Sequence, residues 1–442
     1  MGFTAVWITP VVYNFQGVCH DGREAAHHGY WAEDFSKIDP HLGSLDKLRE
    51  MVNTAHAKDN DIDVIIDMVF NHMCPAEVRP DYQYPYFSWN DFHHNGTIPQ
   101  WAYDNEYRID EEGDKARWVI ENYDVEDLND LDTSQDYVRD TLTSQHAYYY
   151  NYISADGMRL DTFKHISKAD GVQIRNRMNA KITIPKKTFS MGEVYAAGHN
   201  SQSDVAGRTG WYTIEDGQSG GKAADSVLNF ALYNAINSMF DGGARILSEA
   251  KRYQFDEGKY GDPYILGSFI DNHDVARFLS VHDNWDELKE SLTLIFTWPG
   301  IPIVYYGTEQ AMHGGADPDN RYPLWKVGYN KDHPIYKHIQ KLNQLRNGNN
   351  ETGWGLRYGD MVERWSNEYL YAFERIDGVN KVLVMLNTSN LNQKIYDLTT
   401  EIGPGWHTEK LYGNKKLEVQ ENGKINEFWL APYEILVFSN EP

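Results

Sequence analysis

Three carboxylates follow three separate apolar stretches of this chain. Asp161 follows residues 157–160, Glu193 follows residues 188–192, and Asp274 closes the segment 269–274. Each acid stands where a strand-like segment gives way to a loop, which is where a (β/α)8 barrel places its catalytic side chains. Three acids in one pocket cannot all ionise freely, so their surroundings must separate their pKa values. One protonated carboxyl and one ionised carboxylate are what cleavage of a glycosidic bond requires.

The elements that would position these acids alternate along the chain up to about residue 350, as in a parallel sheet with crossover helices. Apolar runs predict strands at 3–9, 62–70, 155–160, 187–192, 226–230, 264–270 and 301–306. Helical patterns occur, among other places, at 44–58, 134–153, 286–297 and 334–347. The fold class predicted is therefore an α/β barrel, although a closed barrel of this kind needs about eight strands and seven are found.

Two segments depart from this alternation. Residues 72–133 are rich in Pro, Asp, Tyr, Trp and His and are too long for an ordinary loop, which predicts a small inserted domain. Beyond residue 352, short alternating runs separated by Asn and Gly turns predict an antiparallel β-sandwich. The predicted domains are a catalytic barrel at 1–71 and 134–352, an inserted domain at 72–133 and a C-terminal domain at 353–442.

Composition excludes several classes of partner. The net charge is −24, from 41 basic and 65 acidic residues, which argues against nucleic acid and against a membrane surface as partners. No charge-free apolar run approaches ~18 residues, so a membrane span is not expected either. The 30 Tyr and 13 Trp suit the stacking of rings on sugars, but ordinary core packing must account for most of them.

The cysteines and the first residues carry less information. Cys19 and Cys74 exclude a disulfide scaffold and lack zinc-site spacing, while a single bridge between them stays open. The chain opens directly with the strand predicted at 3–9, and no signal peptide is recognisable in it.

Four motifs in order resemble the sequence signatures of the α-amylase family of glycoside hydrolases (family 13), closest to the fungal-type α-amylases and their bacterial relatives. The motifs stand at 67–72, 157–165, 192–194 and 269–274, and supporting matches stand at 2–10, 28–31, 128–132, 300–310 and 314–321. The resemblance covers nearly the whole chain. Relative to the family the first strand and first helix of the barrel are missing, which places the inserted domain after strand three.

The resemblance implies a role for each acid. Asp161 would be the nucleophile and Glu193 the general acid and then base, with the two carboxyls about 5–5.5 Å apart as in retaining enzymes. Asp274 would stabilise the transition state. A strand-end Asp can otherwise be a helix N-cap. Arg159 lies two residues before Asp161, so both face the same side of a strand, and it would keep that acid ionised or form an ordinary structural ion pair.

Further residues are expected to bind substrate on the strength of the resemblance. Tyr30 would stack under the sugar beside the cleaved bond, and His72 and His273 would donate hydrogen bonds to its hydroxyls. Lys164 and the His165 side chain would face the leaving-group side. The residues expected on the non-reducing side are Asp317 and Arg321.

A calcium site is also implied, because the family site uses an Asn side chain, an Asp of the inserted domain and a main-chain carbonyl, and hard cations take such oxygen ligands. These correspond to Asn71, Asp130 and the carbonyl of His165. Asp127 is a rival for Asp130, since both precede a Leu. The fourth ligand is left open between Glu121 and Asp124.

The resulting expectation is a calcium-dependent, retaining endohydrolase of α-1,4-glucans that acts on starch or maltooligosaccharides outside the cell. The alternatives are a cyclomaltodextrinase, an α-glucosidase or a glucanotransferase, and, among non-enzymes, an inactive glucan-binding protein. A barrel without its first strand would expose the edges of strands 3–9 and 301–306. That edge would be covered by a homodimer, or else the chain has lost its own N-terminal part.

Overall fold

The computed structural model describes residues 1–19, 24–185 and 188–441, which form two compact units. One unit comprises residues 3–195 and 207–228, and the other comprises 1–2, 196–206 and 229–442. The α-helices are α1 (Leu45–Ala55), α2 (Gln100–Asn105), α3 (Glu111–Ile120), α4 (Asp136–Ile153), α5 (Lys168–Lys181), α6 (Gln202–Gly210), α7 (Phe230–Gly242), α8 (Arg245–Lys251), α9 (Phe278–Val281), α10 (Trp285–Thr297), α11 (Pro334–Asn347) and α12 (Glu351–Tyr358).

The strands of the first unit are β1 (Ala5–Ile8), β2 (Val12–Asn14), β3 (Val18–Cys19), β4 (Glu24–Ala25), β5 (Ala32–Ile38), β6 (Asp63–Val69), β7 (His72–Pro75), β8 (Leu128–Asp130), β9 (Gly157–Asp161), β10 (Phe189–Gly192) and β11 (Ser226–Val227). Those of the second are β12 (Gly267–Ser268), β13 (Ile301–Pro302), β14 (Asp360–Ser366), β15 (Leu370–Asp377), β16 (Asn380–Asn387), β17 (Gln393–Thr399), β18 (Gly405–Thr408), β19 (Lys416–Val419), β20 (Lys424–Leu430) and β21 (Ile435–Ser439).

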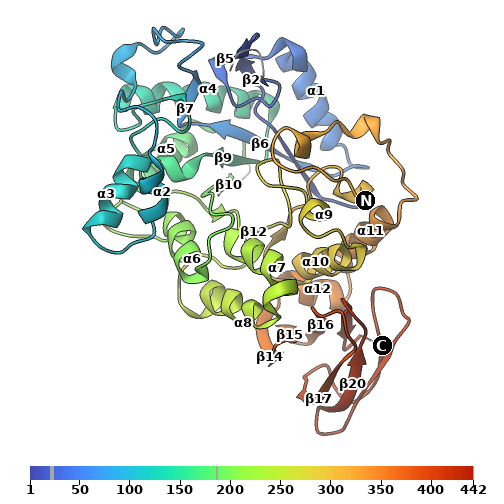
Figure 1. Cartoon of the computed structure of the whole chain (residues 1–442). Coiled ribbons are helices and arrows are strands. Elements are labelled where there is room, and N and C mark those ends of the chain that lie inside the picture. The colour runs from blue at the N-terminus through green and yellow to red at the C-terminus, as the bar shows by residue number, and fades with distance from the viewer. Residues whose placement is uncertain (20–23, 186–187, 442) are drawn as a thin grey trace. The chain divides into compact units, whose positions relative to one another are not determined.

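The first unit is organised by a parallel sheet with strand order β1-β6-β9-β10-β11 (Figure 1). Successive strands are neighbours, and α1, α4 and α5 lie between them in the chain as crossover helices. All five residues of β9 are buried, and so are the last four of β6, which explains their apolar sequences. Asp161 and Glu193, two of the three acids predicted to act, lie at the carboxyl ends of β9 and β10.

The segment between β7 and β8 folds as a small helical structure of its own. Strands β7 and β8 pair antiparallel, and α2 and α3 pack on each other through a buried cluster that includes Ala102, Ala116 and Ile120. Helix α3 begins at the N-cap Asp110, whose side chain accepts a hydrogen bond from the Gly113 amide. This segment supplies several of the polar residues described below.

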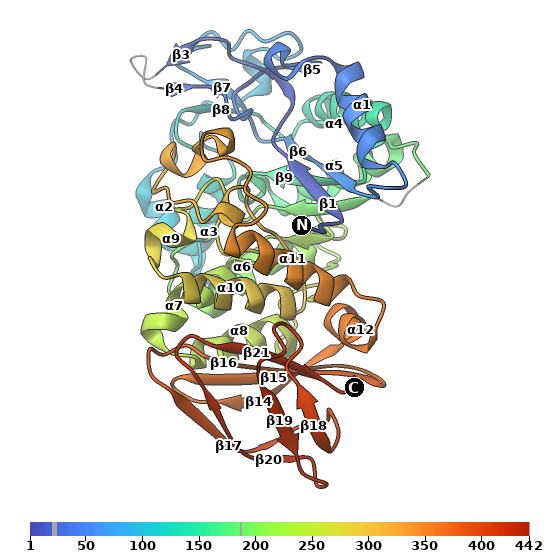
Figure 2. The ribbon, with the colours of Figure 1, turned by 90° about the vertical axis from the view of Figure 1, so that its right-hand side faces the viewer.

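The second unit contains the parallel pair β12–β13 and the antiparallel strands of the C-terminal part. Figure 2 shows the C-terminal strands, β14 to β21. Strands β14, β15, β16 and β21 form one sheet, and β17–β20 and β18–β19 form two further pairs. Apolar side chains from these sheets share a core that includes Leu383, Leu398, Leu417, Ile425 and Phe438. A β-sandwich core of this kind was expected from the alternating sequence.

The strands predicted from the sequence are confirmed, but most are shorter than predicted. The segments predicted at 264–270 and 301–306 each yield two paired residues, in β12 and β13. Residue 187, where one predicted strand begins, lies outside the described residues. Residue propensity predicts where an apolar strand lies in the sequence. The length of the strand in the structure depends on how many of its residues pair with a neighbouring strand.

The structure also bears on three smaller points of the sequence analysis: the two cysteines, membrane-spanning helices and the edge of the parallel sheet. Cys19 and Cys74 are buried and do not form a disulfide with each other. Across the described part of the chain, helices long and apolar enough to cross a membrane are not found. Strand β1 stands at one end of its sheet, with β6 as its paired neighbour.

Candidate active site

The carboxyl ends of the parallel strands bring three acids and one arginine together. Asp67 lies on β6, and Glu193 follows the last residue of β10. Arg159 and Asp161 lie on β9, two residues apart, so their side chains leave the same face of the sheet. Asp67 and Arg159 face each other in register across neighbouring strands. The sheet pairing therefore assembles the cluster from residues that are far apart in sequence.

The guanidinium of Arg159 contacts all three carboxylates. Its Nη1 lies 2.9 and 3.0 Å from the two oxygens of Asp67 and 2.5 Å from Oδ1 of Asp161. Its Nη2 lies 2.7 Å from Oε1 of Glu193. The four side chains are between 0% and 6% exposed. Contacts between ionised groups are strong when they are shielded from water, so this network fixes the acids relative to one another.

A second layer of residues holds Asp67 in place. The hydroxyl of Tyr30 and the indole N–H of Trp7 both donate to Oδ2 of Asp67, at 2.8 and 3.0 Å. The rings of Trp7 and Tyr30 also lie 5.1 and 5.8 Å from the guanidinium carbon of Arg159. Cations are attracted to aromatic rings at such distances. Tyr30, expected to stack under a sugar, thus also supports the charged cluster.

The shared guanidinium sets the electrostatics of the cluster. Burial raises the pKa of Asp67 to about 7; the charge of Arg159 opposes this shift and that of Asp161 adds to it. Burial alone would lower the pKa of Arg159, but the charges of Asp67, Glu193 and Asp161 raise it well above its usual value. Three acids around one cation leave an excess of negative charge, which favours a proton held within the cluster near neutral pH.

Residue Thr162 positions Glu193 through an uncommon backbone conformation. Thr162 has φ 45° and ψ 35°, in the left-handed region that β-branched residues rarely occupy. Its N–H donates to Oε2 of Glu193 at 3.1 Å, and its hydroxyl donates to Oδ2 of Asp161 at 3.2 Å. The N–H of Glu193 donates to the carbonyl of Leu160 at 2.9 Å. The strained residue therefore orients both acids, which is where proteins retain such strain.

His72, the first residue of β7, is buried close to the same cluster. Its Nε2 lies 3.2 Å from the carbonyl oxygen of Tyr30, so in the neutral ring Nε2 carries the proton. Burial lowers the pKa of His72, and the charge of Asp161 opposes that effect. Nδ1 is buried without a hydrogen-bond partner among the described residues. In this form His72 offers Nδ1 to a ligand as an acceptor.

Lys164 and His165 connect the barrel strand to the inserted segment. The Nζ of Lys164 lies 3.0 Å from Oε1 of Glu106, and both side chains are buried. Burial lowers the pKa of Lys164, and the charge of Glu106 opposes this. The Nδ1 of His165 lies 3.1 Å from the carbonyl oxygen of Ile120, at the end of α3. Both side chains therefore make contacts with the inserted segment.

Asp274 lies in a separate cluster, within the second unit. Nη2 of Arg321 donates to Oδ1 of Asp274 at 3.1 Å, and its Nε lies 3.3 Å from Oδ1 of Asp317. Nε2 of His273 lies 3.1 Å from Oδ2 of Asp274. The side-chain amide of Asn320 also supports the loop that carries Asp274, because it donates to the main-chain carbonyl of His273 at 2.9 Å. The four residues predicted here from the sequence are thus brought together around Arg321.

Two of the residues predicted to bind calcium, Asn71 and Asp130, are buried. Asp130 is 1% exposed, and its carboxylate lies 2.6 Å from Nδ1 of His93. Burial raises the pKa of Asp130 to about 7, and the hydrogen bond from His93 opposes this. Asn71 is 1% exposed and lies beside it, because its main-chain carbonyl accepts from the N–H of Leu131. The carboxylate of Asp130 and the side-chain oxygen of Asn71 are the kinds of donor that a hard cation takes.

The rival ligands differ in their contacts. Oδ1 of Asp124 accepts the backbone N–H of Asp130 at 3.1 Å, which places Asp124 at this site. Glu121 lies 3.6 Å from a guanidinium nitrogen of Arg208 instead. Among the described residues, clusters of three or more His, Cys, Asp or Glu suited to a metal are not found, so amide and main-chain oxygens would have to complete the set. These contacts favour Asp124 over Glu121.

Sequence reasoning overlooked Asp67, Trp7 and Glu106. Asp67 interrupts the apolar strand 64–69, and a buried acid in such a strand needs a partner, so this signal was available. The roles of Trp7 and Glu106 had no comparable signal, because each contacts a residue at least 58 positions away.

Known proteins of one family are similar to this chain. The sequence matches the family model of the α-amylase catalytic domain over residues 1–328. It is 33% identical over 451 residues to a beta/alpha-amylase of Paenibacillus polymyxa, covering 99% of the chain and 33% of that protein. It is 31% identical over 459 residues to a cyclomaltodextrin glucanotransferase of Bacillus sp. (strain 1-1), covering 99% and 60% respectively.

The fold of this chain is also similar to that of a solved structure. The crystal structure of an α-amylase from Geobacillus thermoleovorans complexed with acarbose matches with a TM-score of 0.78 and 28% identity, covering 99% of the chain and 88% of that structure. The chain spans only about a third to three-fifths of the length of the curated relatives named above.

Proposed function

Because this chain belongs to the α-amylase family of glycoside hydrolases, we propose that it cleaves internal α-1,4-glucosidic bonds of starch-like glucans and retains the anomeric configuration. Its fold is of the (β/α)8-barrel type, with a C-terminal β-domain. The observation that carries the proposal is the Arg159 guanidinium, which contacts Asp161 and Glu193 on different nitrogens. A retaining glycosidase needs two such neighbouring carboxyls.

The proposed reaction has two steps. In the first, a carboxylate oxygen of Asp161 attacks the anomeric carbon while Glu193 donates its proton to the departing glycosidic oxygen. In the second, Glu193 takes a proton from water, whose oxygen attacks the same carbon and releases Asp161. Arg159 stabilises the ionised form of Asp161, and the Thr162 amide fixes Glu193. Both groups are oriented before substrate arrives.

The cluster around Arg321 would supply the third acid. Arg321 and His273 hold the carboxylate of Asp274 from two directions. We assign to Asp274 the stabilisation of positive charge on the sugar ring in the transition state. Sugar contacts by Tyr30, His72, His273, Lys164, His165, Asp317 and Arg321 are part of the same proposal.

Product analysis tests the reaction. Digestion of starch should give oligosaccharides of mixed length from the start, and NMR of the first products should show α-anomeric reducing ends. Glu193→Gln should give no products. Release of only glucose or maltose, or of β-anomers, would overturn endohydrolysis with retention.

A glucanotransferase is the alternative with a specific observation in its favour, since one of the matched relatives is a cyclomaltodextrin glucanotransferase. Hydrolysis and transfer share the first step and differ in the acceptor, water or a glucan hydroxyl. Assays on starch, cyclodextrins and short maltooligosaccharides would separate the α-amylase from the glucanotransferase, the cyclomaltodextrinase and the α-glucosidase. An inactive glucan-binding protein would instead bind starch without turnover.

We also propose that calcium joins the inserted segment to the barrel through Asn71, Asp130 and the carbonyl of His165. When bound, the ion would supply positive charge to a carboxylate that burial otherwise disfavours. Its role would be structural: Asn71 follows β6, Asp130 ends β8, and His165 follows β9.

We also propose that the protein forms a homodimer and that it acts outside the cell. A homodimer covering the outer edge of β1 is supported by the position of this strand at one end of its sheet. Solution mass measured by light scattering would test it. Action outside the cell rests on the family resemblance, and fractionation of the native host would test it.

A further inference from the structure

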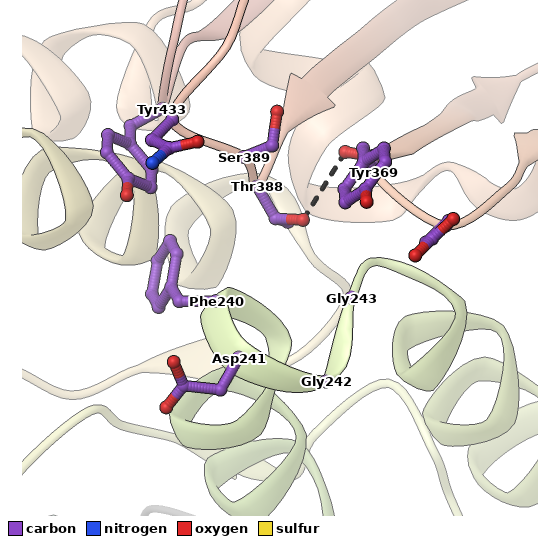
Figure 3. Close-up of a pocket in the computed structure, with 10 residues that line it drawn as sticks. Phe240, Asp241, Gly242, Gly243, Tyr369, Thr388, Ser389 and Tyr433 are labelled. Atoms are coloured by element: carbon purple, nitrogen blue, oxygen red, sulfur yellow. Dashed lines mark hydrogen bonds between the residues drawn. The ribbon is translucent and has the colours of Figure 1, made fainter.

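A pocket lies in the second compact unit and shares no residue with the sites described above. Its volume is about 330 Å³, near the lower end of the roughly 300–1,000 Å³ usual for small-molecule sites. Figure 3 shows it where the turn after α7 meets the loops of the C-terminal sheets. It is lined by Phe240, Asp241, Gly242, Gly243, Glu368, Tyr369, Thr388, Ser389, Asn390 and Tyr433.

Aromatic rings form two sides of this pocket. The rings of Phe240 and Tyr433 lie 5.9 Å apart at an angle of 68°, and Figure 3 shows Tyr369 on the other side of Thr388. The Tyr369 side chain is 40% exposed and so is available for contact. Flat, partly exposed rings suit the apolar face of a sugar, because they combine large contact area with little loss of side-chain freedom.

The polar groups of the lining suit hydroxyls and disfavour anions. Asp241 and Glu368 can accept hydrogen bonds, and the amide of Asn390 can both accept and donate. The lining residues include neither Lys nor Arg, so an anionic ligand would meet only like charges. A ligand with several neutral hydroxyls and an apolar face satisfies this set.

Backbone contacts hold together the segments that line the pocket. Gly243 has φ +86°, and a Cβ there would lie 2.4 Å from the carbonyl oxygen of Glu368, so only glycine allows this approach. The N–H of Ala244 donates to that carbonyl at 2.8 Å. Opposite, the N–H of Tyr433 donates to the carbonyl of Ser389 at 3.1 Å. A rigid pocket binds at lower entropic cost than a loose one.

From these features we infer that the pocket is a secondary carbohydrate site that holds one or two glucosyl units of an α-glucan. The inference rests on the proposed function for the identity of the sugar. Binding a second stretch of the same polymer raises its effective concentration at the acids, and short substrates would not benefit.

The test uses Glu193→Gln as a parent that binds starch without consuming it. In native gels containing soluble starch, Tyr369→Ala and Asp241→Ala in this parent should each raise the apparent dissociation constant about threefold to tenfold. Tyr148→Ala is the matched control, because Tyr148 is an exposed ring (55%) on α4. It should leave the retardation by starch unchanged.

The same substitutions in the enzyme with Glu193 intact give the second readout. Turnover of a chromogenic maltotrioside should stay at the wild-type value, while kcat/KM on soluble starch should fall. Unchanged starch retardation, equal loss in Tyr148→Ala, or parallel loss on the maltotrioside would each overturn the inference. Selective loss of retardation by a protein whose wild type hydrolyses no glucan would support the pocket and refute the proposed function.

Discussion

Asp67 and Arg159 stand opposite each other on neighbouring strands, and both carboxylate oxygens of Asp67 lie within hydrogen-bonding distance of one guanidinium nitrogen, at 2.9 and 3.0 Å. The same nitrogen reaches Asp161. Asp67 therefore acts on the proposed nucleophile through Arg159 and is a positioning residue. This arrangement makes the state of Asp67 matter to the chemistry, although Asp67 need not touch the sugar.

Replacing Asp67 by Asn should lower kcat about tenfold to hundredfold with little change in KM, because Arg159 would lose an orienting partner. The effect on stability should depend on pH. The carboxyl has a pKa of 3.8 in the unfolded chain and about 7 when buried, so the folded state binds its proton more tightly. The wild type therefore loses stability as pH rises through this window, and Asn does not.

Urea unfolding at about pH 5 and about pH 8 checks this linkage. The advantage of wild type over Asp67→Asn should shrink at the higher pH. Tyr30→Phe removes one hydrogen bond to Asp67 without removing a charge, so its stability difference should vary less between the two pH values. A difference for Asp67→Asn that grows with pH would contradict a raised pKa.

Asp161→Asn and Glu193→Gln should each reduce hydrolysis of starch at least about a thousandfold while the protein stays folded. Both changes keep the shape of the side chain and remove a charge or a proton. Circular dichroism and melting curves would verify folding. Near-wild-type turnover by either variant would refute the assigned roles.

Azide separates the two roles. With Asp161→Ala, azide should restore slow turnover and give a glycosyl azide of inverted configuration, because the anion attacks from the face left by the carboxylate. With Glu193→Ala and an activated substrate, the azide product should retain its configuration. The reverse pattern would exchange the two assignments.

Arg159→Lys should lower kcat/KM at least about a hundredfold even though the charge is kept, since a Lys ammonium cannot present separate nitrogens to Asp161 and Glu193. Arg175→Lys, which alters an ion pair with Asp225, is the control. A kcat/KM of Arg159→Lys within about threefold of the wild-type value would contradict the proposed pairing.

Removal of calcium should lower the melting temperature, and added calcium should restore it. At a free concentration of about 100 times Kd, binding stabilises by about 2.7 kcal/mol. Asp130→Asn should abolish the response to calcium, whereas Asp127→Asn should retain it. If the response to calcium were lost in Asp127→Asn instead, Asp127 would be the ligand. If elemental analysis found no metal in the protein, the proposed calcium site would be refuted.

Lys164→Met should destabilise the protein by about 3 kcal/mol, because Glu106 would keep a buried charge without its nearest partner. Arg208, whose Nε lies 3.6 Å from Glu106, limits the loss. Adding Glu106→Gln to Lys164→Met should recover part of the stability. Thermal melts of the two single variants and the double variant measure this coupling, and strictly additive losses would show that the pair is not coupled.

Much of this site could be predicted from local sequence. Asp161 and Glu193 end apolar runs, and the spacing of Arg159 and Asp161 places them on one face of a strand. Their meeting with Asp67 could not be predicted in the same way, because it depends on the register between β6 and β9. Register is set by sheet packing over distant residues, and a shift by one would turn every side chain to the other face.

The limits of sequence reasoning are also visible at His72 and Lys164. Both residue types were expected to contact sugar, but whether His72 donates or accepts depends on the nearby carbonyl of Tyr30. The partner of Lys164 is Glu106, which comes from a segment whose helices have no counterpart in the alternating pattern. Such contacts arise from tertiary folding alone.

The hydrogen bond from Trp7 to Asp67 has a consequence for measurement. An indole N–H that donates to a carboxylate with a pKa of about 7 experiences a different electric field when that group gains a proton. Fluorine-labelled tryptophan would therefore give, at Trp7, a spectral line whose position follows the protonation of the cluster. The molecule thus carries an internal probe by which its ionisation can be recorded directly, without substrate and without turnover.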